Sequence, residues 1–363
     1  MIIEIEKEFQ KTVDEIKALI ISKHCRPDIL FGDLYTVIAV EGDASQLNTE
    51  FFEAFPGVVR AWRISSPYKT IARKVIGKEH QKIERERLKV SVPGGPDGHV
   101  RIFSDARYTF IAGPCTVESY DQAAKIGDGL AKLADKYAIR DRFLMRAGLF
   151  KPRTRPSDFR GLGFEGLDIM DKVRANTGLP YVSEVMAVDQ ISEMAKRVDM
   201  LQIGTRNFQN FNLLEELGKT GKPILYKRGI AAPLEEWLSA CEYIALQGNK
   251  NIVLCERGVK STTHGDYNRS HLDFDVIRAV KERTILPIAI DPSHSSGVAD
   301  LVPYQFSAAS AYGANATIVE VIADDTDRRT ILCDGKQGVR LKVFEKMIQY
   351  QLAFEKIAPD FRE

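Results

Sequence analysis

Ionisable side chains follow short apolar stretches in the later part of the chain, at the point where each stretch ends. One group offers a sulfur, a nitrogen and two carboxylates, from Cys115, His294, Glu320 and Asp334. Thiolate and imidazole ligands favour Mn²⁺, Fe²⁺, Co²⁺ or Zn²⁺ over the ions that take all-oxygen sites. Alone, Cys115 is more often a small buried apolar residue, and His294 a hydrogen-bonded loop residue. Together the four predict a divalent metal site that polarises a carbonyl oxygen.

A second group of side chains is cationic and begins in FLMRAGLFKPRTRP, residues 143–156, where an apolar run becomes basic. Its members at the ends of the runs are Arg146, Lys151, Arg206, Lys227 and Arg257. Arginine binds carboxylate or phosphate through two parallel hydrogen bonds, whereas lysine acts as a point charge and a possible proton donor. These residues predict a site for a phosphate and a carboxylate. The alternatives are a solvated basic loop, salt bridges to Glu184 or Glu256, and a Schiff base on Lys227.

The elements that must position these residues alternate between short β-branched runs and helix-length amphipathic segments. Eight runs occur from Thr109 onward: TFIAGPC, RFLMRAGLF, LPYVSEV, VDMLQIGTR, KPILYKRG, NIVLCERG, LPIAIDPSHS and ATIVEVI. This alternation predicts a (β/α)₈ TIM barrel, with a doubly wound sheet as the alternative. The barrel is favoured because barrel active sites lie at the C-terminal ends of the strands.

The preceding residues divide into two parts. Residues 1–75 show the order strand, helix, strand, strand, helix, strand, which predicts a small ferredoxin-like (βαββαβ) domain. Residues 76–108 are highly charged and then rich in glycine and proline, so we expect a linker with a hairpin near its end. The barrel domain is then expected over residues 109–363.

Composition narrows the class of protein. The 363 residues carry a net charge of +1, which argues against nucleic acid as the main partner. The N-terminus MIIEIEKEFQ is acidic where a signal peptide is basic, and no apolar run reaches membrane-spanning length. We therefore expect a cytoplasmic protein with no membrane partner. Five widely spaced cysteines without CxxC pairs predict neither a disulfide framework nor a zinc finger.

Several segments resemble the signature segments of 3-deoxy-D-arabino-heptulosonate 7-phosphate (DAHP) synthases of the type Iβ class. They are GPCTVES, RAGLFKPRTRP, QIGTRNFQNF, LYKRG, LCERGV, DPSHSSG, IVEV and DGKQ. The resemblance covers residues 109–350, and the N-terminal part resembles the ferredoxin-like regulatory domain of some of these enzymes. It implies the metal-dependent condensation of phosphoenolpyruvate with erythrose 4-phosphate, a first step towards the aromatic amino acids. It further implies feedback by an aromatic amino acid at the N-terminal domain, and a homo-oligomer, expected to be a tetramer.

The resemblance also assigns roles to positions of this chain. It implies that Cys115, His294, Glu320 and Asp334 bind the metal and that Lys151 is catalytic together with Cys115 and His294. Lys151 is well placed to protonate the alkoxide that the condensation forms, and a metal-bound water is the alternative proton donor. The implied phosphoenolpyruvate contacts are Arg146, Lys151, Arg206, Lys227 and Arg257, with Glu184 nearby. The implied erythrose 4-phosphate contacts are Lys151, Pro152, Arg153 and Thr154. The chain departs from the familiar pattern in a longer segment before the barrel and in Cys333 beside Asp334.

Two other functions are compatible with parts of this pattern. A sister family condenses phosphoenolpyruvate with arabinose 5-phosphate on a similar barrel, but it carries a KANRSS-like segment where this chain has KPRT. A non-catalytic sensor would use the N-terminal domain to bind a metabolite and the barrel as a scaffold. The complete set of metal-ligand types argues against the sensor, because a scaffold does not need them.

Overall fold

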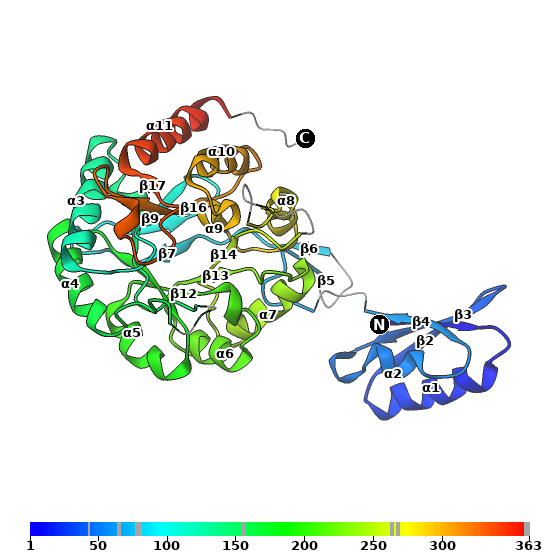
Figure 1. The fold of residues 1–363 in the computed structure, drawn as a ribbon. Coiled ribbons are helices and arrows are strands. Elements are labelled where there is room, and N and C mark those ends of the chain that lie inside the picture. Colours follow the sequence, from blue (N-terminus) through cyan, green and yellow to red (C-terminus); the bar gives the residue numbers. More distant parts are fainter. Residues whose placement is uncertain are drawn as a thin grey trace. The chain divides into compact units, whose positions relative to one another are not determined.

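The computed structural model describes residues 1–42, 44–63, 67–76, 82–153, 155, 157–261, 265 and 269–358. These residues form two compact units (Figure 1). The smaller unit contains Met1–Lys69 and Val75–Lys82, and the larger contains Thr70–Lys74 and Ile83–Glu363. No helix in the described parts of the chain combines the length and the apolar character that crossing a membrane requires.

The smaller unit has the predicted βαββαβ order. Its elements are β1 (Ile2–Glu6), α1 (Gln10–Ser22), β2 (Arg26–Phe31), β3 (Tyr35–Glu41), α2 (Thr49–Glu53) and β4 (Val58–Trp62). The antiparallel sheet has the strand order β2-β3-β1-β4. Alternation along β1 and β3 buries Ile3, Ile5 and Ile38, which pack against Val13 and Ile16 of α1. This confirms the predicted ferredoxin-like fold.

The larger unit is a closed barrel of eight parallel strands. They are β9 (Thr109–Gly113), β10 (Phe143–Arg146), β11 (Tyr181–Val185), β12 (Met200–Ile203), β13 (Ile224–Lys227), β14 (Ile252–Glu256), β15 (Ile288–Ile290) and β16 (Ala316–Ile322). Each pairs with its neighbours in sequence, and β16 pairs with both β15 and β9, which closes the ring. All eight apolar runs therefore form strands, and the closed ring excludes the doubly wound sheet.

Helices surround the barrel strands, as Figure 1 shows in a view along the barrel. They are α3 (Tyr120–Lys136), α4 (Glu165–Thr177), α5 (Ile191–Arg197), α6 (Phe211–Lys219), α7 (Leu234–Leu246), α8 (Phe274–Arg283), α10 (Val302–Ala311) and α11 (Leu341–Ile357). The short helix α9 (Pro292–Ser296) directly follows β15 and carries His294. A short strand β17 (Val339–Arg340) pairs with β16 just before α11. The helices bury their apolar faces on the strands, so the polar ends of the strands are left to form a site.

A hairpin closes the N-terminal end of the barrel. It consists of β7 (Val90–Val92) and β8 (Arg101–Phe103), and it follows the short pair β5 (Lys74–Ile76) and β6 (Lys82–Glu84). Val90, Val92 and Phe103 are fully buried among the inward side chains of the barrel strands. Within the segment expected to be a linker, the hairpin thus packs as part of the barrel unit. Residues 77–81 of that segment lie outside the described residues.

Asp105, next to this hairpin, is expected to stabilise the barrel unit in a pH-dependent way. Its carboxylate lies 2.8 Å from Lys281 Nζ and 2.8 Å from Arg87 Nε, and it accepts a hydrogen bond from Asn315 Nδ2. Burial alone would raise the pKa of Asp105, but these partners lower it to about 2. A lowered carboxyl pKa stabilises the fold above the unfolded-state pKa, and this contribution is lost as the pH falls through the folded-state value.

Asp105→Asn should therefore lower the free energy of unfolding near neutral pH by about 1 kcal/mol, because the side chain is 41% exposed and its ion pairs are screened. The difference between variant and wild type should shrink as the pH falls from about 4 to about 2. Urea unfolding at several pH values measures it. A difference that is independent of pH in this window would show that the charge of Asp105 is not involved.

Candidate active site at the mouth of the barrel

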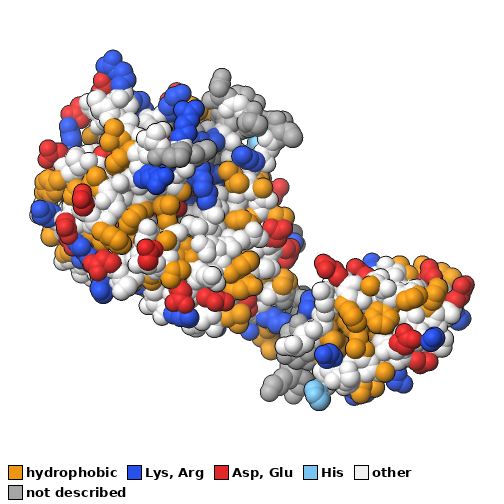
Figure 2. Space-filling model, turned by 60° about the horizontal axis from the view of Figure 1, so that its bottom comes forward, with side chains coloured by type: hydrophobic (Ala, Val, Ile, Leu, Met, Phe, Trp, Pro, Cys, Tyr) orange, Lys and Arg blue, Asp and Glu red, His pale blue; other side chains and the backbone are white. Residues whose placement is uncertain are grey.

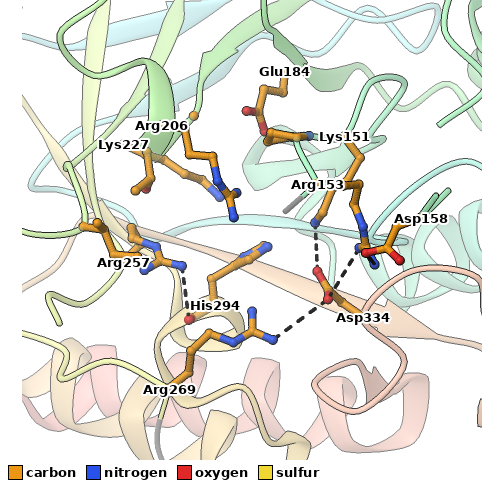
Figure 3. Close-up of a pocket in the computed structure, with 14 residues that line it drawn as sticks. Lys151, Arg153, Asp158, Glu184, Arg206, Lys227, Arg257, Arg269, His294 and Asp334 are labelled. Atoms are coloured by element: carbon orange, nitrogen blue, oxygen red, sulfur yellow. Dashed lines mark hydrogen bonds and ion pairs between the residues drawn. The ribbon is translucent and has the colours of Figure 1, made fainter. Parts of the chain in front are cut away.

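The C-terminal ends of the barrel strands surround a cavity of about 330 Å³. Figure 3 shows the charged side chains of the cavity directed towards its centre from different strands and loops. Among the described residues, six Lys and Arg side chains line it, and Figure 2 shows Lys and Arg side chains gathered on one part of the larger unit. The lining residues are Lys151, Pro152, Arg153, Asp158, Glu184, Gly204, Thr205, Arg206, Lys227, Ile230, Arg257, Arg269, His294 and Asp334.

Potential metal ligands meet at one side of this cavity. Side-chain atoms of His294, Glu320 and Asp334 lie within 4.8 Å of one another, and so do those of Cys115, Cys333 and Asp334. Asp334 belongs to both sets, and its Oδ2 lies 3.7 Å from Cys115 Sγ. The four residues predicted as metal ligands are therefore close together around Asp334. Cys333 adds a second sulfur to this cluster. The sequence analysis noted it beside Asp334 but did not predict a role for it.

His294 is held in a form that can bind a cation. Its Nδ1 lies 2.7 Å from the buried carboxylate of Asp291, whose Oδ1 also accepts the backbone N–H of His294. Burial lowers the pKa of His294 to about 4, although Asp291 and Glu320 oppose this shift. The ring is thus neutral, and the tautomer that donates Nδ1–H to Asp291 leaves the Nε2 lone pair free. A neutral imidazole fixed by a carboxylate is a typical metal ligand.

Glu320 supports the same interpretation. The carboxylate is 1% exposed, and neither of its oxygens has an aligned hydrogen bond from the described residues. Its Oε1 lies 3.2 Å from His294 Nε2 and 3.2 Å from Arg146 Nη1. With the ring neutral, the Nε2 lone pair of His294 and a carboxylate oxygen of Glu320 face each other. Two buried acceptors that face each other repel, and a cation bound between them would relieve this.

Cys115 lies where the metal set and the cationic set meet. Its Sγ accepts a hydrogen bond from Lys151 Nζ at 2.9 Å and lies 3.0 Å from Cys333 Sγ. Burial raises the pKa of the Cys115 thiol well above its ordinary value, and Cys333 and Glu320 raise it further. Burial therefore favours the protonated thiol, and a bound metal ion would favour the thiolate, as expected of a ligand that exchanges its proton for a metal.

Lys151 and Arg153 follow β10 and enter the cavity beside Asp334. Lys151 Nζ lies 3.1 Å from Asp334 Oδ2, and Arg153 Nη1 lies 3.8 Å from Oδ1 of the same carboxylate. Burial would lower the pKa of Lys151, but Cys115 when its thiol is ionised, and the carboxylates of Glu320 and Asp334, raise it above its ordinary value. Lys151 is therefore a protonated ammonium group that can hold an anion or donate a proton.

Arg206, Lys227 and Arg257 lie across the cavity from Lys151 and Arg153 (Figure 3), whereas Arg269 Nη2 lies 3.9 Å from Asp334 Oδ1. Lys227, at the end of β13, lies 2.5 Å from Asp291, and Arg257 donates to the carbonyl oxygen of His294 at 3.3 Å. The ion pair with Asp291 is the salt bridge of Lys227, and Glu256 pairs with Arg228 at 3.0 Å. The predicted alternative was that Glu184 or Glu256 forms a salt bridge with each of these cations. For a salt bridge between Lys227 and Glu256 this is wrong, because each of the two has a different partner. Asp291 instead orients both Lys227 and His294.

Glu184 lies at the base of the cavity and accepts a hydrogen bond from Gln202 at 3.0 Å. Burial raises the pKa of Glu184, while Lys227 and Lys151 act in the opposite direction. Gly204 makes this position possible, because a Cβ there would lie 1.9 Å from Glu184 Oε1. Any other residue at 204 would displace Glu184 or the turn that carries Arg206.

Most of the predicted substrate residues line this cavity, whereas Arg146 and Cys115 line a smaller recess beneath it. Thr154 lies outside the described residues. Sequence reasoning missed Asp158 and Arg269, which line the cavity from loops. Arg269 lies in a polar segment between β14 and α8, and no strand end marks it, so the only available signal was its charge.

The chain resembles known proteins along its whole length. A family model described as the DAHP synthetase I family matches residues 80–357, and one described as the DAHP synthase ferredoxin-like domain matches residues 1–66. A curated phospho-2-dehydro-3-deoxyheptonate aldolase of Thermotoga maritima is 34% identical over 340 residues, covering 94% of this chain and 93% of its own. The crystal structure of a Thermotoga maritima DAHP synthase superposes with a TM-score of 0.84 at 31% identity, covering 98% and 97% of the two chains.

A second group of relatives matches the barrel. A 2-dehydro-3-deoxyphosphooctonate aldolase of Desulfatibacillum aliphaticivorans is 30% identical over 264 residues, covering 68% of this chain and 92% of its own. This match covers a smaller part of the present chain than the match to the heptonate enzyme does, because the heptonate enzyme also matches the N-terminal part. From the family match over most of the chain and the matched N-terminal domain, we conclude that this protein belongs to the DAHP synthetase I family.

Proposed function

We propose that this chain condenses phosphoenolpyruvate with erythrose 4-phosphate and water to give DAHP and phosphate. The reaction is that of the family, and it is the first step of the shikimate pathway. One observation about the site supports it most strongly: a cluster of potential metal ligands and a cavity with six cations share Asp334 and His294. The reaction brings together two phosphates, one carboxylate and an aldehyde, and the site has groups suited to each.

The cations would hold the two substrates in a reactive arrangement. We propose that Arg146, Lys151, Arg206, Lys227 and Arg257 bind phosphoenolpyruvate, with Glu184 beside them. Pro152, Arg153 and Thr154 would bind erythrose 4-phosphate together with Lys151. Fixing two reactants at contact distance removes much of the entropic barrier to their reaction.

Cys115, His294, Glu320 and Asp334 would hold the divalent metal, for which the mixed sulfur, nitrogen and oxygen set suits Mn²⁺, Fe²⁺, Co²⁺ or Zn²⁺. When bound, such an ion supplies Lewis acidity to an aldehyde oxygen. Asp291 would keep the His294 ring in the tautomer that presents Nε2. Lys151, protonated and 2.9 Å from Cys115 Sγ, would donate a proton to the oxygen that becomes an alkoxide.

Arg153→Ala should weaken the binding of erythrose 4-phosphate more than the binding of phosphoenolpyruvate, because Arg153 lies in the part of the cavity proposed to bind the sugar phosphate. A lost charge-assisted hydrogen bond is worth about 1.5–3 kcal/mol for the ligand it touched, which corresponds to a rise in KM of about 10- to 150-fold. Steady-state kinetics with each substrate varied in turn measures both constants. Equal rises in the two KM values would contradict the assignment of Arg153 to the sugar phosphate.

One assay tests the proposed reaction itself. Consumption of phosphoenolpyruvate is followed with erythrose 4-phosphate or arabinose 5-phosphate, each with and without EDTA. We expect a preference for erythrose 4-phosphate and a loss of activity with EDTA that added metal reverses. An equal or reversed preference would favour the sister reaction of the phosphooctonate enzymes, and no consumption with either sugar would favour a non-catalytic sensor.

We further propose that the N-terminal domain regulates the barrel. None of the described residues that line the cavity belongs to the smaller unit, yet this unit has a hydrophobic core of its own. An aromatic amino acid that binds this domain in a homotetramer would favour an arrangement with low activity, and a coupling of about 1–3 kcal/mol would suffice. The alternative is a packing or oligomerisation role. We also propose that the protein is cytoplasmic, in keeping with its metabolic substrates.

A further inference from the structure

The loop that carries Asp334 lies between the turn Arg328–Thr330 and β17. Asp334 is separated from Cys115 by 219 positions along the chain, so the loop must be tied to the Cys115 segment for both to reach one ion. Its backbone has a φ of 46°, in the left-handed region that residues other than glycine rarely adopt. Cys333, directly before Asp334, is buried with its Sγ 3.0 Å from Cys115 Sγ, whereas Leu332 before it is 56% exposed, so burial anchors Cys333 but not Leu332.

A carboxylate from the Cys115 segment provides such a tie. Glu118 Oε1 accepts the backbone N–H of Leu332 at 3.1 Å. The N–H of Cys333 is also close enough to this carboxylate to act against the rise that burial causes in its pKa. Leu332 and Cys333 lie directly before Asp334. The hydrogen bond of Leu332 therefore holds the chain just before the point where it turns into the left-handed residue.

Glu118 is itself firmly held. Its own N–H donates to Gln122 Oε1 at 3.0 Å, and Gln122 Nε2 donates to the carbonyl oxygen of Thr116 at 3.2 Å. Ser119 caps α3 by accepting the N–H of Gln122. The first turn of α3 thus fixes the backbone of Glu118 three residues beyond Cys115.

Other hydrogen bonds act on the later part of the same loop. Arg328 Nη1 donates to the carbonyl oxygen of Gly335 at 2.6 Å, and the N–H of Ala299 donates to that of Lys336 at 3.1 Å. Both contacts hold residues after Asp334, and neither involves the Cys115 segment. Glu118 therefore acts on the residues before Asp334, from the side of Cys115.

We propose that Glu118 is a positioning residue for the metal site, holding Asp334 at the distance from Cys115 that a shared ion requires. This inference rests on the proposed metal site and adds a residue that does not itself touch the ion. Groups that orient metal ligands typically contribute 10- to 100-fold to metal affinity. Glu118 is partly exposed in a second cavity of about 350 Å³, so replacing it does not open a hole in the core.

The test is a titration of metal-free full-length protein with Co²⁺, followed by the thiolate-to-cobalt absorption band. Wild type is compared with Glu118→Ala, with Glu118→Gln, which keeps an oxygen acceptor, and with Asp325→Ala. Asp325 lines the same cavity but is 68% exposed and pairs with Lys125, so its variant controls for the loss of a negative charge there. Glu118→Met replaces the Ala variant if the latter does not fold.

We expect Glu118→Ala to bind Co²⁺ about 10- to 100-fold more weakly, and Glu118→Gln and Asp325→Ala to stay within about threefold of wild type. Excess metal should restore kcat in Glu118→Ala with an unchanged KM for phosphoenolpyruvate, which a damaged fold would not allow. Equal affinity of Glu118→Ala and wild type would overturn the role of Glu118 alone, as would an equal loss in Asp325→Ala. Absence of a thiolate band in wild type would overturn the metal site as well.

Discussion

Cys115→Ala is expected to give a folded protein that binds little metal and has little activity. Cys115 is the sulfur among the proposed ligands, and its Sγ also accepts the hydrogen bond from Lys151. The removal of a residue that only orients a ligand costs about 10- to 100-fold in affinity, so the loss of a ligand should cost at least about 100-fold. Metal content after dialysis and steady-state kcat measure the two effects.

The matched control for this variant is Cys241→Ala. Cys241 is a buried cysteine on α7 that lines neither the main cavity nor the smaller recess beneath it. The Cys241→Ala variant should keep its bound metal and its activity, and circular dichroism should show that both variants are folded. Full activity of Cys115→Ala in buffer treated with EDTA would refute the assignment of Cys115 to a metal site.

Deletion of the N-terminal domain is expected to abolish feedback inhibition while leaving catalysis intact. The barrel unit begins with Thr70–Lys74, where the N–H of Thr70 donates to Glu242 at 2.6 Å and that of Arg73 donates to the carbonyl oxygen of Arg283 at 2.8 Å. A chain starting at Pro67 retains these contacts. Intact and truncated proteins are assayed with tyrosine, phenylalanine and related metabolites.

The starting residue of the truncated chain must leave the barrel unit intact, so that a change in inhibition is not confused with a loss of stability. A chain starting near His99 would lose β7, and with it the buried Val90 and Val92, so any loss of activity could be a loss of stability. If the intact protein is inhibited and the chain starting at Pro67 is inhibited equally, the effector binds the barrel, and the N-terminal domain has a structural role.

The sequence predicted the barrel and its polar end because each strand carries two readable signals. A run such as ATIVEVI is too short and too β-branched for a helix, and its polar residue, Glu320, interrupts an otherwise apolar stretch. Parallel strands of a barrel all end at the same face, so residues far apart in the chain could be grouped before their positions were known. This reasoning placed Cys115, His294 and Lys227 together.

The same reasoning fails where a residue acts from a loop or through another residue. Arg269 enters the cavity from an irregular segment, and neither a period nor a strand end distinguishes it from other basic residues. Glu118 holds a backbone N–H more than two hundred positions away, and only the folded chain reveals this partner. The hairpin of β7 and β8 was predicted, but its place at the bottom of the barrel depends on the shape of the closed ring.

The left-handed backbone of Asp334 limits which residues can replace it during evolution. Aspartate and asparagine adopt that region more readily than other residues with side chains, and glycine adopts it without steric cost, so selection for stability alone would not retain Asp334 in preference to glycine or asparagine. Asp334 persists only while its carboxylate is needed. Relatives that keep the barrel but have lost the reaction should therefore accept glycine or asparagine at this position. The residue at this position should thus distinguish inactive relatives from active ones when the rest of the sequence is similar.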